Sequence, residues 1–162
     1  MRREIPPVKR ISCWITGGLS LALMVMIFLF SAQDADASHL VSGGILNAVI
    51  GWLRPLANAL IHPAPDDETL ELILRKLGHF SEYAALGACL CLFLHSLDRK
   101  HCAPAAWFAA TLYAGTDELH QLFSAGRTAA VTDVCIDSCG ALTGIALVSL
   151  VLWLLGRRTK PD

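Results

Sequence analysis

The sequence contains few charged residues and no concentration of basic ones. Charged side chains make up 17% of its 162 residues, whereas they make up about a quarter of a typical soluble domain. The formal net charge is −1, and the lysines and arginines form no stripe of the kind that binds nucleic acid. The composition therefore argues against a nucleic-acid partner.

Sequence motifs of several enzyme classes are absent as well. The chain has no glycine-rich phosphate loop, no Walker motif and no G-x-S-x-G nucleophile elbow. Its six cysteines include no C-x-x-C pair, so we interpret them as small buried side chains rather than zinc ligands or disulfide partners. The fold and the function must therefore be inferred from the apolar segments and from the polar residues between them.

Long apolar runs dominate the chain, with 54% apolar residues and a mean hydropathy of +0.52. The first run is longer than the apolar part of an ordinary signal peptide, so we interpret it as an uncleaved signal-anchor. The sequence predicts an all-α polytopic membrane protein, a four-transmembrane-helix bundle in a single domain of residues 1–162. The predicted transmembrane helices are residues 11–31, 75–97, 104–123 and 133–155.

The predicted external loop of residues 32–74 has helical features of its own. Apolar residues recur in it at helical spacing, but Gly43-Gly44 and Pro55 interrupt the pattern. We expect one or two short amphipathic helices on the outer membrane interface, with a re-entrant hairpin as the alternative. Asp66 or Asp67 is expected to cap the helix that follows.

Lysines and arginines predict the orientation. Most of the 13 lie on one side of the predicted helices, and such an excess marks the cytoplasmic side. Both termini are therefore expected in the cytoplasm. The cytoplasmic group is Arg2, Arg3, Lys9, Arg10, Arg99, Lys100, Arg157, Arg158 and Lys160, and the external group is Arg54, Arg75, Lys76 and Arg127.

Ionisable residues of three predicted helices share one depth. A helical rise of about 1.5 Å per residue places Glu82, Asp117 and Asp133 in the same outer third of the bilayer. Such residues are costly inside a membrane and indicate a functional site by default. The candidate catalytic residues are His79, Glu82, Asp117, Glu118, Asp133 and Asp137, and the candidate ligand-binding residues are Arg75, Lys76, Gln121, Arg127, Ser31 and Gln33.

The last predicted helix carries small residues below its carboxylates. Gly140 and Gly144 share a face with Asp133 and Asp137, because residues three and four apart lie on one side of a helix. Small residues at such spacing let a neighbouring helix approach closely. We therefore expect a tight helix crossing beside the polar site.

Three kinds of chemistry suit this site, and the residues alone do not choose between them. Carboxylates with a histidine can hold a divalent cation, although no metal ligand is assigned. A glutamate or histidine can act as a general acid or base. Arg75, Lys76 and Arg127 can bind a phosphate or carboxylate. The structural alternative is that these three cations only neutralise the carboxylates.

Five short motifs follow one another along the chain. They are Ser31-x-Gln33, Arg75-Lys76-x-x-His79-Phe80-x-Glu82-Tyr83-Ala84-x-Leu86-Gly87, Asp117-Glu118-x-x-Gln121, Gly126-Arg127 and Asp133-Val134-x-x-Asp137-x-x-Gly140. Together they resemble the VanZ-like family. The resemblance implies a bacterial multi-pass membrane protein, and the namesake of the family is associated with resistance to the glycopeptide antibiotic teicoplanin.

The leading functional hypothesis is a protein of the bacterial cytoplasmic membrane with an outward-facing polar site. Besides its contact with membrane lipids, it would bind a lipid, a cell-wall precursor or a glycopeptide-related ligand, with a link to teicoplanin resistance. One alternative is an enzyme that modifies a lipid or lipid-linked wall precursor by carboxylate–histidine or metal-assisted chemistry. The other is a non-catalytic scaffold. Enzymatic activity, cofactor and oligomeric state stay open.

The predicted orientation can be measured with a reporter enzyme that is active only outside the cytoplasm. Fused after Thr128, the reporter should be active, because the loop of residues 124–132 is predicted to be external. Fused after Arg99, it should be inactive. The opposite pattern would overturn both the orientation and the outward-facing site.

Overall fold

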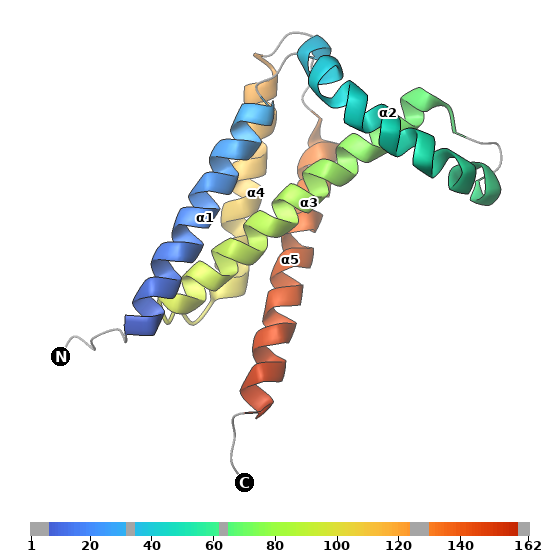
Figure 1. The fold of residues 1–162 in the computed structure, drawn as a ribbon. Coiled ribbons are helices and arrows are strands. Elements are labelled where there is room, and N and C mark those ends of the chain that lie inside the picture. The colour runs from blue at the N-terminus through green and yellow to red at the C-terminus, as the bar shows by residue number, and fades with distance from the viewer. Residues whose placement is uncertain (1–6, 32–34, 62–64, 124–129, 159–162) are drawn as a thin grey trace.

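A computed structural model describes the chain at residues 7–31, 35–61, 65–123 and 130–158. The described residues form helices joined by turns and contain no strand. The helices are α1 (Pro7–Ser31), α2 (Ala35–Leu60), α3 (Asp67–Ser96), α4 (Cys102–Gln121) and α5 (Val131–Arg158) (Figure 1). The prediction of an all-α fold is confirmed.

Helices α1, α3, α4 and α5 run together as a bundle (Figure 1). Helix α3 packs against each of the other three and has its most extensive contact with α5. The beginning of α1 and the end of α5 lie at the same end of the bundle, and α2 lies at the opposite end. One end of the bundle therefore carries α2, and the other end carries the beginning of α1 and the end of α5.

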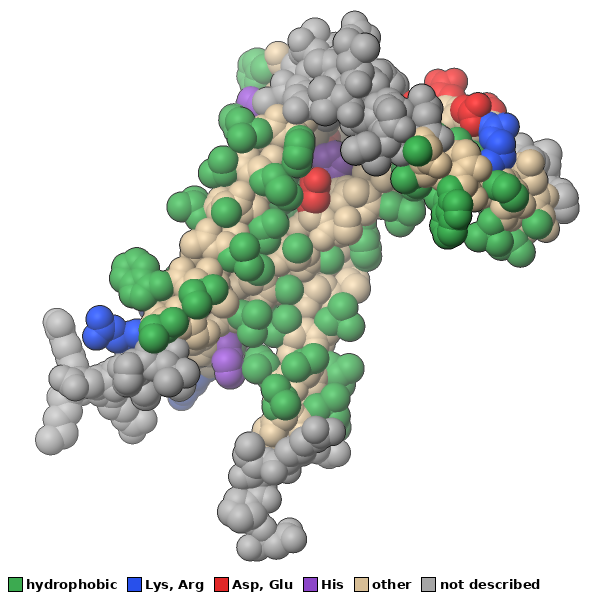
Figure 2. Space-filling model, viewed as in Figure 1, with side chains coloured by type: hydrophobic (Ala, Val, Ile, Leu, Met, Phe, Trp, Pro, Cys, Tyr) green, Lys and Arg blue, Asp and Glu red, His purple; other side chains and the backbone are tan. Residues whose placement is uncertain are grey.

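Three helices are long and apolar enough to cross a membrane. These segments are Arg10–Ser31, Asp67–Ser96 and Val131–Gly156. The visible face of the bundle is mostly hydrophobic, with acidic and histidine side chains only in small patches (Figure 2). Three membrane-spanning helices are thus supported by length and composition. Helix α4 is not among these three, so its crossing stays a prediction.

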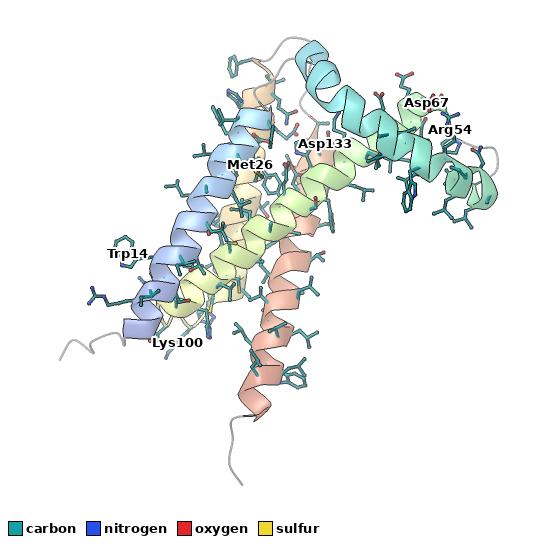
Figure 3. The ribbon with its side chains drawn as sticks, in the orientation of Figure 1. Trp14, Met26, Arg54, Asp67, Lys100 and Asp133 are labelled. Atoms are coloured by element: carbon teal, nitrogen blue, oxygen red, sulfur yellow. The ribbon has the colours of Figure 1, made fainter. Side chains whose placement is uncertain are left out.

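Helix α2 differs from the expected one or two short helices. It is one element of 26 residues and contains Pro55 in its interior. It leans away from the bundle and contacts α3, and an ion pair between Arg54 and Asp67 joins the two helices (Figures 1 and 3). A proline inside a helix costs about 3 kcal/mol, yet it does not end α2, since the apolar residues keep their helical spacing on both sides of it.

Helix α3 begins where the acidic residues predicted. The Asp66 side chain accepts a hydrogen bond from the Thr69 amide at 2.8 Å and so satisfies one of the amides that a helix start leaves unpaired. At the other end, Asp98 has a φ of 53°. Aspartate tolerates this left-handed conformation, which lets the chain reverse between α3 and α4.

Three glycines bring α3 and α5 into backbone contact. A Cβ atom at Gly144 would lie 1.9 Å from the Ala84 carbonyl oxygen, and one at Gly140 would lie 2.3 Å from the Phe80 carbonyl oxygen. Gly87 on α3 faces α5 in the same way, since a Cβ atom there would lie 2.5 Å from the Ala141 carbonyl oxygen. The expected tight crossing of small residues is confirmed.

The cysteines are not all buried. Cys91 is buried, whereas Cys135 and Cys139 are exposed on the surface of α5. The prediction of small buried side chains is therefore wrong for these two residues. They lie on the side of α5 away from Gly140 and Gly144, the face that packs against α3.

Replacing Gly144 with alanine should destabilise the bundle. The new methyl group would collide with the Ala84 backbone, which cannot rotate away as a side chain could. We expect a loss of roughly 1–3 kcal/mol, the usual cost of overpacking, measured as a lower melting temperature in detergent. Gly115→Ala is the matched control, because nothing lies within 4 Å of a Cβ atom at that position. Equal melting temperatures for the two variants would contradict the close crossing.

Candidate functional site

Polar residues of the bundle meet at the end that carries α2. Figure 3 shows Asp133 there, between α3 and α5, whereas Trp14 and Lys100 lie at the opposite end. Asp137 interacts electrostatically with four other carboxylates, so all five share one region. We call these five residues the acidic cluster; they are Glu82 on α3, Asp117 and Glu118 on α4, and Asp133 and Asp137 on α5.

Two members of the acidic cluster are almost completely buried. Only 1% of Asp137 and 3% of Asp117 is exposed. Oδ1 of Asp137 and both carboxylate oxygens of Asp117 have no hydrogen-bond partner among the described residues. Ser31 and Gln121 lie next to Asp117, but not with the geometry of an ordinary hydrogen bond. Buried acceptors without a partner are uncommon in native proteins and need an explanation.

Two other members have partners that tie helices together. The Lys76 ammonium donates a hydrogen bond to Asp133 and forms an ion pair with it, which joins α3 to α5. The amide of Ala130 donates to Oε2 of Glu118 at 3.0 Å, which joins the start of α5 to α4. The charge of Lys76 is therefore already used inside the bundle.

The Tyr83 hydroxyl lies in the site, although Tyr83 is not among the candidate site residues predicted from the sequence. The Tyr83 ring packs in the core with Ile27, Leu86 and Ala114. Its hydroxyl is buried, has no hydrogen-bond partner in the part of the chain that the structure describes, and lies in the field of Asp117 and other acidic residues. The sequence could have indicated this position of Tyr83, because Lys76 and Tyr83 are seven residues apart and therefore share one helix face.

Two histidine side chains of the bundle, the predicted His79 and also His120, lie beside Asp117. His79 on α3 and His120 on α4 interact electrostatically with this carboxylate. The His120 ring also contacts the Phe28 ring of α1, with 4.3 Å between the centroids. Helix α1 thus contributes to the site through Phe28 and through the completely buried Ser31.

The remaining predicted residues are distributed differently. Gln121 is buried next to Asp117. Arg75 is exposed and lines a shallow depression with Glu68, Thr69, Glu71 and Leu72 on the surface of α3. Gln33 and Arg127 lie outside the described residues. The structure therefore brings together the carboxylates, both histidines, Lys76, Gln121 and Ser31, whereas Arg75 lies apart.

The acidic side chains are not arranged as a metal site. Within the described residues, no group of three or more histidine, cysteine, aspartate or glutamate side chains is placed to hold a metal ion. What the arrangement offers is a set of oxygen acceptors from separate helices, with hydroxyl and imidazole groups beside them. Such a site can accept hydrogen bonds or protons from a bound molecule.

The ion pair between Lys76 and Asp133 should contribute to the stability of the bundle. In a double-mutant cycle with Lys76→Met and Asp133→Asn, we expect a favourable coupling of roughly 0.5–3 kcal/mol, the range for residues in direct contact. Thermal unfolding in detergent at low salt measures it. Lys100→Met with Asp133→Asn is the control pair, since Lys100 lies at the other end of the bundle (Figure 3). Coupling of equal size in the control pair would contradict the contact.

Comparison with known proteins gives one match. The family model described as VanZ/LLP1 matches residues 18–153, which includes α2, α3, α4 and the greater parts of α1 and α5. No curated protein and no solved structure matches the chain significantly. The matched segment contains the entire acidic cluster and the glycine crossing that brings α3 and α5 together. The chain therefore belongs to the VanZ-like family.

Proposed function

We propose that this protein binds the polar head of an amphiphilic molecule of the bacterial envelope in the acidic cluster. The observation that carries the proposal is the burial of Asp117 and Asp137 with carboxylate oxygens that lack partners among the described residues. Such groups destabilise a folded protein unless something satisfies them. A ligand with hydrogen-bond donors would do so, and ionisable residues within a membrane usually serve function.

The proposal includes α4 as a fourth membrane-spanning helix. Its 20 residues span about 30 Å at a rise of about 1.5 Å per residue, close to the thickness of the hydrocarbon layer. Phe108, Leu112 and Leu119 are exposed, whereas Asp117 and Glu118 are buried. This division suits a helix with one face toward lipid and one toward a polar site. With the termini in the cytoplasm, the acidic cluster faces outward.

The surroundings of the acidic cluster suit an amphiphile better than a water-soluble molecule. Trp52, Leu56 and Leu60 are exposed on α2, beside the same end of the bundle (Figure 1). An apolar helix surface of this kind rests in the membrane interface. A lipid, a lipid-linked wall precursor or a glycopeptide-related ligand would keep its chain in the bilayer and present its head group at this depth.

Removing the buried charges should remove the bound ligand. We expect the full-length protein, purified in mild detergent, to carry an enriched lipid or wall-precursor species. Its amount should fall by about tenfold or more in Asp117→Asn and Asp137→Asn, since tenfold corresponds to the loss of about one charge-assisted contact. Mass spectrometry of the extracted molecules measures the change.

The matched control is Asp98→Asn. Asp98 is an exposed carboxylate in the turn after α3, away from the acidic cluster, and asparagine tolerates its positive φ. Identical extracts from all variants would contradict ligand binding at this site. Loss of folded protein in both buried variants, with no enriched species in the wild type, would favour a scaffold. Teicoplanin susceptibility of cells with and without the protein tests the link to resistance.

A further inference from the structure

Some carboxylate oxygens of the acidic cluster have no hydrogen-bond partner among the described residues. Two strong donors found there among the described residues are already engaged, the Lys76 ammonium with Asp133 and the Ala130 amide with Glu118. Three carboxylate oxygens of Asp117 and Asp137 remain buried, and none of the described residues is a hydrogen-bond partner for them. Burial strengthens the field of these carboxylates, because little water screens them.

Two uncharged side chains beside Asp117 also carry buried polar atoms without a hydrogen-bond partner among the described residues. The hydroxyls of Ser31 and Tyr83 are completely buried and have no hydrogen-bond partner among the described residues. Ser31 comes from α1 and Tyr83 from α3, and both interact with Asp117. Buried serine and tyrosine hydroxyls normally find a partner. Four helices therefore direct polar atoms to one place where the described residues leave them unsatisfied.

The chemistry of these atoms selects among ligand groups. A phosphate or carboxylate would meet like charges on Asp117 and Asp137, and like charges in a poorly screened site repel strongly. A divalent metal needs several ligands around one point, and the described side chains form no such group. A primary ammonium group brings one positive charge and three N–H donors. Its charge is opposite to that of the carboxylates, and its N–H groups can donate to the unsatisfied acceptors.

We infer that the acidic cluster recognises a primary ammonium group on its ligand. The inference rests on the proposed function and adds the chemical class of the head group. The amine has two conceivable sources, the head group of an aminolipid or a water-soluble amine. The apolar surfaces of α2 and α4 beside the site favour the amine of an amphiphile.

Three short-chain phospholipids with identical acyl chains test the inference on the wild-type protein. Phosphatidylethanolamine carries a primary ammonium, phosphatidylcholine has the same charge but no N–H donor, and phosphatidylglycerol has no cation. Native mass spectrometry of the full chain in detergent should show phosphatidylethanolamine binding at least about tenfold more tightly than the other two. This comparison needs no variant and so does not depend on how a variant folds.

Variants then assign the preference to the acidic cluster. Asp117→Asn and Asp137→Asn should each reduce the preference for phosphatidylethanolamine over phosphatidylcholine by about tenfold, whereas Asp98→Asn should leave it unchanged. Asp137→Glu, which keeps the charge, should retain part of the preference. A preference that survives in both asparagine variants would overturn the inference.

The outcomes separate the inference from the function on which it rests. If phosphatidylglycerol or phosphatidylcholine binds as tightly as phosphatidylethanolamine, the ammonium inference fails and the binding of an amphiphile stands. If free ethanolamine binds as tightly as the lipid, the ammonium inference stands and the amphiphile does not. If none of the four probes binds, both fail.

Discussion

The backbone contact between α3 and α5 is the constraint on which the site depends. Gly87, Gly140 and Gly144 leave no room for side chains between the two helices. Because the helices cross so closely, Lys76 reaches Asp133 and the Tyr83 hydroxyl lies in the field of Asp137. A wider crossing would lengthen each of these interactions. Glycine loses more conformational freedom on folding than other residues, so this arrangement exchanges some helix stability for a short distance between polar groups.

Burial of the acidic cluster works against the stability of the fold. Asp117 and Asp137 are buried and keep carboxylate oxygens without a hydrogen-bond partner among the described residues. Unpaired buried charges are among the more costly features that a protein can keep. In most of a protein, local propensity, core packing and polar pairing favour the same structure. Functional sites are the usual exceptions. In the described part of this bundle, the buried carboxylates without partners lie at the end where α2 also lies.

Helix α1 contacts the candidate site and is also long and apolar enough to cross a membrane. Its Met24 carbonyl accepts a hydrogen bond from the Tyr113 hydroxyl of α4 at 2.6 Å, and its last residue is the buried Ser31. Phe28 lies against His120. These contacts fix α1 beside α4 at the depth of Asp117. The family match also begins within α1, at residue 18, in agreement with a role for this helix in the common fold.

Much of this architecture could be predicted from sequence, because apolar length, helix caps and charge spacing are local properties. They predicted the all-α class, a helix start at Asp66 or Asp67, the glycine face of α5 and the closeness of Glu82, Asp117 and Asp133. The continuity of α2 could not be predicted, since a proline such as Pro55 disfavours a helix interior. Which charges are neutralised was decided only by the tertiary structure: Lys76 pairs with Asp133, Arg75 lies apart, and Asp117 and Asp137 keep oxygens without partners among the described residues. Pairing depends on distances between helices, and those distances arise from packing rather than from spacing along the chain.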